Sequence, residues 1–179
     1  MADAGDPVPA FKDRLVFDDA AGELRDGSRR YLLLRPDALM TMFRLLPTET
    51  RALALGALEQ AVHQQGSDSA RAYLAHGGGD VDMLLAIIER TSPQLGWGTW
   101  RFEADGDTLR LEVHNSPFAH AFGPSEQPVC HAVKGMLRGL ADLWLGCPTR
   151  SDELQCAAQH HPACTFEARA AQASLQRAG

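Results

Sequence analysis

The chain has 179 residues, a formal net charge of −6 and 45% hydrophobic residues. This length fits one domain with a sizeable core, and the acidic balance without a Lys/Arg stripe argues against a nucleic-acid-binding protein. No apolar run approaches the roughly 20 residues of a membrane span, and the N-terminal residues lack the basic and apolar regions of a signal peptide. These features indicate a cytoplasmic protein, whose cysteines are expected to stay reduced.

Short strands and a helix are expected in the first quarter of the chain. Residues 15–17 and 29–34 are apolar or aromatic stretches joined by Gly-containing turns, which is typical of short strands. Pro36 can occupy a first helical turn, so residues 37–46 are predicted to form a helix that Pro47 ends.

Two longer helices are expected next. Thr48 can cap the first of them, and Leu55, Leu58 and Val62 share one face of it. Gly56 and Gly66 should weaken this helix.

A run of three glycines at residues 77–79 then breaks the chain. Asp80 can cap a further helix with a buried face of Val81, Leu84, Leu85 and Ile88. The glycines lack the Lys-Ser/Thr end of a phosphate-binding loop, so a turn or hinge is the better interpretation.

The last part of the chain alternates strands and a helix. Apolar side chains recur at every second position on both sides of the turn at residues 105–107, which predicts a hairpin. After a loop at 115–127, a helical stripe is formed by Cys130, Val133, Leu137, Leu140, Ala141 and Trp144. Residues 150–155 and 164–168 are expected to form a closing strand pair. The fold class is therefore α+β, with an antiparallel sheet of about four or five strands packed with helices.

Three of the four cysteines lie in this last part, at Cys130, Cys156 and Cys164, and Glu153 precedes Cys156 by three residues. Cys and Glu are both zinc ligands, but buried thiols also occur in cores without a metal, so the spacing alone leaves both interpretations open. His160 and His161 compete with Glu153 for a ligand position. Cys147 is best explained as a free thiol.

Residues 127–166 resemble the core of the 4-vinyl reductase domain family. Pro128-Val129-Cys130 precedes a helix with small residues, Glu-x-x-Cys occupies residues 153–156, and Cys-x-Phe occupies residues 164–166. The family includes relatives of bacteriochlorophyll 4-vinyl reductase and the sensor domains of aromatic-responsive bacterial regulators.

The resemblance implies a structural zinc, because aromatic-sensing members hold one at these four positions. The implied ligands are Cys130, Glu153, Cys156 and Cys164, which would clip the C-terminal hairpin. Three thiolates and a carboxylate fill a tetrahedral site and leave no place for a catalytic water.

The resemblance also implies a homodimer and a small hydrophobic or aromatic ligand between helices and sheet. The candidate ligand-binding residues are Trp97, Trp100, Phe102, His114, Phe118, Phe122, Met136 and Trp144. Ordinary core packing is the alternative role for each of them. The His and Trp pair that holds a phenol hydroxyl in aromatic-sensing relatives has no clear counterpart, so phenol itself is not implied.

We expect residues 13–170 to form one domain with its signature region at 96–170, between a flexible lead-in at 1–12 and a tail at 171–179. The favoured function is a stand-alone sensor or carrier that acts through a partner protein, since no ATPase loop or helix-turn-helix is evident. No catalytic residue is identified. The alternatives are an accessory or reductase-type protein of tetrapyrrole or aromatic metabolism, which lacks a dinucleotide fingerprint, and a non-catalytic scaffold.

Overall fold

The computed structural model describes residues 10–75 and 79–171, and the chain divides into two compact units, Met1–Arg35 and Pro36–Gly179. The predictions for most of the lead-in, for the tail beyond residue 171 and for the glycines at 77 and 78 lie outside the described residues. Each unit has its own sheet, and each is described by itself.

The first unit is a small antiparallel sheet with a single helical turn. Its elements are α1 (Phe11–Arg14), β1 (Val16–Asp18), β2 (Glu23–Asp26) and β3 (Arg29–Tyr31), with the strands in the order β1-β2-β3. The rings of Phe11 and Tyr31 meet edge to face with centroids 5.4 Å apart, and Arg14 pairs with Asp26 at 2.9 Å. The strand expected over residues 29–34 ends at Tyr31, and Leu32, Leu33 and Leu34 are exposed.

The second unit is built on a four-stranded antiparallel sheet in the order β4-β5-β7-β6, which confirms the predicted α+β fold. The strands are β4 (Thr99–Asp105), β5 (Thr108–His114), β6 (Thr149–Gln155) and β7 (Cys164–Ala170). Alternate side chains of the central strands are buried on one face, among them Leu111, Val113 and Phe166. This alternation produces the period of two in the sequence.

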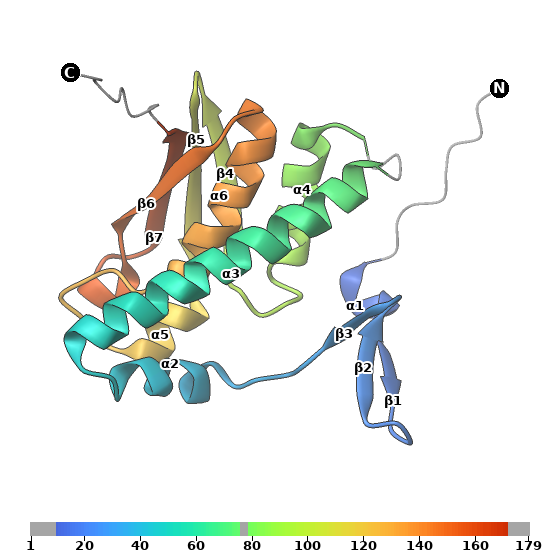
Figure 1. Cartoon of the computed structure of the whole chain (residues 1–179), viewed down its shortest axis with the longest axis horizontal. Helices are drawn as coiled ribbons and strands as arrows, with labels where there is room; N and C mark the ends of the chain where they lie inside the picture. The colour runs from blue at the N-terminus through green and yellow to red at the C-terminus, as the bar shows by residue number, and fades with distance from the viewer. Residues whose placement is uncertain (1–9, 76–78, 172–179) are drawn as a thin grey trace, which may run out of the picture. The chain divides into compact units, whose positions relative to one another are not determined.

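The described part of this unit has five α-helices, and those that touch the sheet lie on that buried face (Figure 1). The five are α2 (Pro36–Arg44), α3 (Thr48–Ala75), α4 (Val81–Thr91), α5 (Pro117–Phe122) and α6 (His131–Leu145). Helix α6 packs on β6 and β7, α4 packs on β4, and α3 crosses the outer side of α6. Among residues 10–75 and 79–171, every helix is too short or too polar to span a lipid bilayer.

Helices α3 and α6 approach each other closely at two glycines of α6. A Cβ on Gly135 would overlap the backbone carbonyl of Glu59, and a Cβ on Gly139 would lie 2.7 Å from the Ser67 hydroxyl. Helix α3 also continues through Gly56 and Gly66, which were expected to weaken it. Packing on α6 outweighs the local cost of glycine here.

The loop expected at residues 115–127 contains a helix, α5, which is a correction to the prediction. The Ser116 hydroxyl accepts a hydrogen bond from the Ala119 N–H, and Pro117 occupies the first helical position. Both are standard signals for a helix N-terminus, but the helix is so short that its own periodicity is invisible in the sequence.

Candidate metal centre

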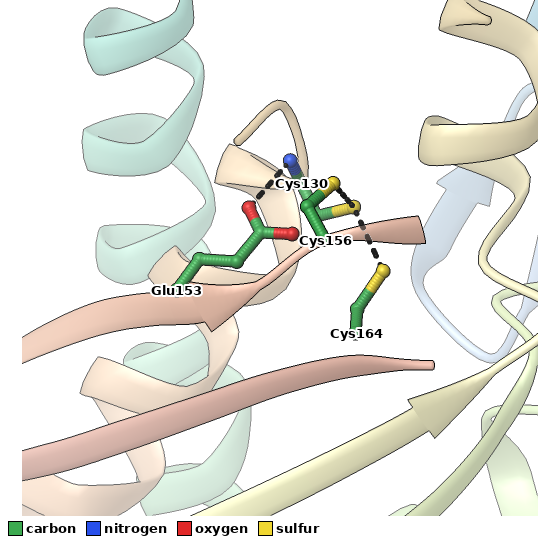
Figure 2. A group of neighbouring side chains, drawn as sticks. All are labelled: Cys130, Glu153, Cys156 and Cys164. Carbon is green, nitrogen blue, oxygen red and sulfur yellow. Dashed lines mark hydrogen bonds between the residues drawn. The ribbon is translucent and has the colours of Figure 1, made fainter. Parts of the chain in front are cut away.

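Three cysteines and one glutamate meet where the start of α6 reaches the loop end of the β6–β7 hairpin (Figure 2). Cys130 is the N-cap residue of α6, Glu153 lies in β6, Cys156 follows β6 and Cys164 begins β7. One ligand atom from each residue can be chosen so that all four lie within 4.8 Å of one another, and all four residues are buried. We call this group the Cys3Glu cluster.

A register shift in β6 brings Glu153 and Cys156 to the same side. Residues three apart in a regular strand point to opposite faces, but Glu153 pairs with Phe166 while Gln155 pairs with the adjacent Thr165. This irregularity leaves Leu154 as an extra, exposed residue, 58% accessible. A bulge of this kind re-aims the side chains after it, and both Glu153 and Cys156 become buried.

The distances within the Cys3Glu cluster suit a tetrahedral zinc ion. The Cys130 sulfur lies 3.9 Å from that of Cys156 and 3.7 Å from that of Cys164. Zinc–sulfur bonds of about 2.3 Å place two sulfurs of a tetrahedron about 3.8 Å apart. The separations therefore match the edges of such a site.

The carboxylate has one satisfied and one free oxygen. Glu153 Oε2 accepts a hydrogen bond of 2.9 Å from the Cys130 backbone N–H, whereas the buried Oε1 has no hydrogen-bond partner. Figure 2 shows this second oxygen on the side of the sulfur atoms. A buried, unpaired carboxylate oxygen is costly, and coordination of a cation would satisfy it.

The charges in the cluster repel one another when no cation is present. Burial, followed by the nearby Cys156, raises the pKa of Glu153 to about 9. Contacts with the Cys156 and Cys164 thiols raise the pKa of Cys130, while hydrogen bonds from Cys130 and then Cys156 lower the pKa of Cys164. Without a metal, the Cys3Glu cluster therefore favours a state in which only one of its cysteines is deprotonated. Binding of a divalent cation would release the protons of the other cysteines.

The other candidate ligands lie outside the cluster. His160 and His161 are exposed and are not members of the cluster. Glu153 is its fourth member, beside the three cysteines. Cys147 is half-buried beyond the C-cap Gly146 of α6 and is not part of the group.

Four of the eight candidate ligand-binding residues form a continuous aromatic group. Trp97 contacts both Trp100 and Phe118, with ring centroids 6.2 and 5.1 Å apart, and Trp100 contacts Phe102 at 6.0 Å. The Trp100 indole donates a hydrogen bond to the Trp97 carbonyl. We call Trp97, Trp100, Phe102 and Phe118 the aromatic cluster.

The other four candidates lie elsewhere. Phe122 is buried beneath the guanidinium of Arg51, and Met136 lies against Gly66 of α3. His114 is exposed and pairs with Glu112, and Trp144 is partly buried on α6. The structure therefore does not gather all eight residues into one group.

Each unit has a surface cleft among its described residues. The cleft of the second unit has a volume of about 300 Å³ and is lined by Pro36, Pro93, Gly96, Gly98, Thr99, Asn115, Pro117 and His120. The cleft of the first unit is lined by residues between Phe17 and Leu33. Neither lining includes one of the eight candidates.

Comparison with known proteins places these features in a family. The family model of the 4-vinyl reductase domain matches residues 109–170, a segment that contains the complete Cys3Glu cluster. No curated protein matches the chain significantly.

Solved structures with TM-scores above 0.5 share the fold at low sequence identity. The phenol-responsive sensory domain of the transcription activator PoxR, solved with phenol, is 20% identical with a TM-score of 0.71, over 88% of this chain and 85% of that one. Subunit 3 of the trafficking protein particle complex from Naegleria fowleri, covalently bound to palmitic acid, is 11% identical with a TM-score of 0.53, over 75% and 93%. A vinyl-4-reductase family protein from Methanocaldococcus jannaschii is 13% identical with a TM-score of 0.48, over 78% and 96%.

The predicted relationship to the 4-vinyl reductase domain family is confirmed by the family model over residues 109–170, from the central strand β5 to the end of β7.

Proposed function

We propose that this chain is a small-molecule-binding sensor or carrier domain that is stabilised by one zinc ion. The observation that carries the proposal is the Cys3Glu cluster within the segment that matches the 4-vinyl reductase domain. Cys130, Glu153, Cys156 and Cys164 would hold the ion, which would tie the start of α6 to the β6–β7 hairpin. Thiolate ligands favour zinc among the available divalent metals, and a closed tetrahedral site has a structural role.

The ligand in this proposal is a small hydrophobic or aromatic molecule. The support is the similarity in fold to a phenol-responsive sensory domain, together with the aromatic cluster next to the sheet. Trp97 and Phe102 are only partly buried, so their rings are the members of the cluster that a ligand can reach first. The domain would then act on a partner protein in the cytoplasm, where its thiols stay reduced.

A homodimer is part of the proposal. In the first unit only Phe11 and Leu24 are buried hydrophobic residues among those that the structure describes, whereas Val16, Phe17, Leu32, Leu33 and Leu34 are exposed. A unit of 35 residues rarely forms a sufficient core by itself, and apolar stretches of this size often mark an interface. Light scattering of the wild type and of Leu33→Asp tests this point, with a dimer expected only for the wild type.

Elemental analysis and native mass spectrometry test the metal. Protein purified without added metal should contain one zinc per chain, and Cys156→Ser should lose it while Cys147→Ser keeps it. A wild-type protein without metal would overturn the zinc assignment.

Tryptophan fluorescence and thermal shift with phenol, indole and naphthalene as probes test the ligand class. Binding should be saturable and should weaken in Trp97→Leu more than in Trp144→Leu. If none of the three probes binds the zinc-loaded protein, the proposed ligand class is wrong.

A further inference from the structure

The hydroxyl of Ser116 lies against the Cys3Glu cluster although Ser116 is not one of its members. Ser116 is 2% exposed, and its Oγ is 3.3 Å from the Cys130 sulfur. The residue is also the N-cap of α5, where Oγ accepts the Ala119 N–H at 3.4 Å. Its oxygen therefore faces a helix, and its single hydrogen remains available for the sulfur.

The direction of this hydrogen bond follows from the chemistry of a metal ligand. Cys130 must be deprotonated to coordinate a cation, and a thiolate can only accept hydrogen bonds. Ser116 must then be the donor. Cys164 receives a comparable bond of 3.2 Å from the Ala157 backbone N–H.

Hydrogen-bond donors of this kind compensate the negative charge of the ligands that the metal ion does not neutralise. Three thiolates and a carboxylate carry more negative charge than a divalent cation neutralises, and the cluster is buried. Outer hydrogen bonds to the ligands lower this cost and orient them. Two of the donors in this site are backbone N–H groups, of Cys130 and Ala157, whereas the Ser116 hydroxyl can be removed by mutation.

Ser116 is also joined to the aromatic cluster by a short, stiff piece of chain. Pro117 follows it, and Phe118 is buried with its ring edge to face against Trp97. On the other side of Ser116, Asn115 has a φ of 56°, and a Cβ on Gly98 would overlap the His114 carbonyl. These contacts leave the segment little freedom to move independently of either site.

We propose that Ser116 is a positioning residue that couples the metal centre to the aromatic cluster. Its hydroxyl holds the Cys130 thiolate, and loss of that bond shifts the start of α5 and therefore the contact between Phe118 and Trp97. Because coupling between two sites is reciprocal, a ligand that displaces Trp97 or Phe118 changes the affinity for the metal. This inference rests on the proposed zinc site and ligand site and adds the link between them.

The test compares the wild type with Ser116→Ala and with Ser151→Ala as a matched control. Ser151 is similarly buried, 3% exposed, and its hydroxyl donates to the Lys134 carbonyl instead of to a thiol. Zinc affinity is measured by competition with a chromophoric chelator. Ser116→Ala should bind zinc about 10- to 100-fold more weakly, and Ser151→Ala should match the wild type.

The absorption spectrum of the cobalt-substituted protein is a second measurement, and a general loss of stability would not change it. The cobalt–thiolate charge-transfer band depends on hydrogen bonding to the sulfurs, so it should shift in Ser116→Ala and stay in place in Ser151→Ala. Ser116→Thr keeps a hydroxyl, so its zinc affinity and its charge-transfer band should both match those of the wild type. This variant also provides a test of the hydrogen bond if Ser116→Ala does not fold.

Tryptophan emission during zinc titration reports the coupling. Zinc should change the emission of the wild type, and Phe118→Leu should still bind zinc but lose most of that response. Unchanged zinc affinity and cobalt spectrum in Ser116→Ala, or a full response in Phe118→Leu, would overturn the inference. A wild-type protein that binds no zinc would instead contradict the proposed function.

Discussion

A buried and a half-buried polar group lie on different faces of α6, and they differ in how their charges are balanced. In the Cys3Glu cluster a carboxylate lies among thiols, its Oε1 has no partner, and the pKa of Glu153 is raised to about 9. Between α3 and α6, Glu59 pairs with Lys134 and His131, each at 3.0 Å, and Asp142 pairs with His63 at 2.7 Å. For Glu59, burial raises the pKa, but the hydrogen bonds from His131 and Lys134 outweigh it and lower the pKa overall.

The difference shows which of the two groups requires a cation that the chain itself does not supply. The α3–α6 interface contains its own cation, Lys134, and hydrogen-bond partners for both carboxylates, which stabilise their charged form. The Cys3Glu cluster gathers acidic groups only, an arrangement that stabilises a protein when a metal ion supplies the positive charge.

Metal removal should affect the Cys3Glu cluster most. Treatment of the wild type with a zinc chelator should lower the free energy of unfolding by more than about 4 kcal/mol, as loss of a structural metal typically does. Cys164→Ser should show the same loss without a chelator. Urea unfolding with and without chelator measures both.

Cys147→Ser is the control, because Cys147 lies outside the cluster. It should respond to the chelator as the wild type does. A wild-type protein whose unfolding curve does not change with the chelator would show that the cluster is held without a metal.

The α3–α6 interface should instead be sensitive to volume. Gly135→Ala places a Cβ against the Glu59 carbonyl, so overpacking should exceed the gain in helix propensity and cost about 2 kcal/mol. Gly56→Ala on α3 has open space within 4 Å of the new Cβ and should stabilise the protein by about 0.5 to 1 kcal/mol. Thermal unfolding of the two variants should show shifts of opposite sign, and equal shifts would contradict the close approach of the helices.

Breaking the charge balance at the interface should have a somewhat smaller effect. Glu59→Gln leaves Lys134 without its carboxylate at a partly buried position and should cost about 1.5 kcal/mol. Asp68→Asn removes a carboxylate from an exposed pair with Arg71 on the same helix and should cost less than about 0.5 kcal/mol. Chemical denaturation of both variants with zinc bound measures the contrast, and similar losses would mean that burial adds nothing to the Glu59 pairs.

The sequence was more informative about the Cys3Glu cluster than about the interface. Cys130, Glu153, Cys156 and Cys164 lie within 35 residues of one another, and the resemblance supplied their grouping. The strand pair that carries Glu153 and Cys164 also follows from local alternation. The partners Glu59 and His131 are 72 residues apart, and nothing in their local sequence indicates that the two helices cross there.

Ser116 shows a different limit. Its capping role was readable from the Ser-Pro pair, but its contact with Cys130 depends on where α5 packs, which only the fold determines. The bulge at Leu154 was equally hidden, because a register shift arises from pairing with β7 and not from β6 alone. Periodicity predicts which face of an element is buried, and tertiary contacts decide which polar atoms meet there.

Acid should reveal the smallest contribution, that of Asp142. Burial raises its pKa, but hydrogen bonds from His63 and Thr149 outweigh burial and lower the pKa below the usual value. A carboxyl group whose pKa is lower in the folded state stabilises the fold above the unfolded-state pKa of about 3.9, and this stabilisation is lost as the pH falls through the folded-state pKa.

Asp142→Asn should therefore cost about 1 kcal/mol at pH 6, and the difference from the wild type should shrink as the pH approaches 3 or below. A zinc ion in the Cys3Glu cluster would be released in acid, so urea unfolding of the metal-free proteins at each pH removes that effect. A difference that stays constant from pH 6 to pH 3 would show that the charge of Asp142 contributes nothing, and that only its shape matters between Thr149 and His63. A difference that disappears in acid would establish that this side of α6 is stabilised by charges from the chain itself, in contrast to the cluster at its N-terminus.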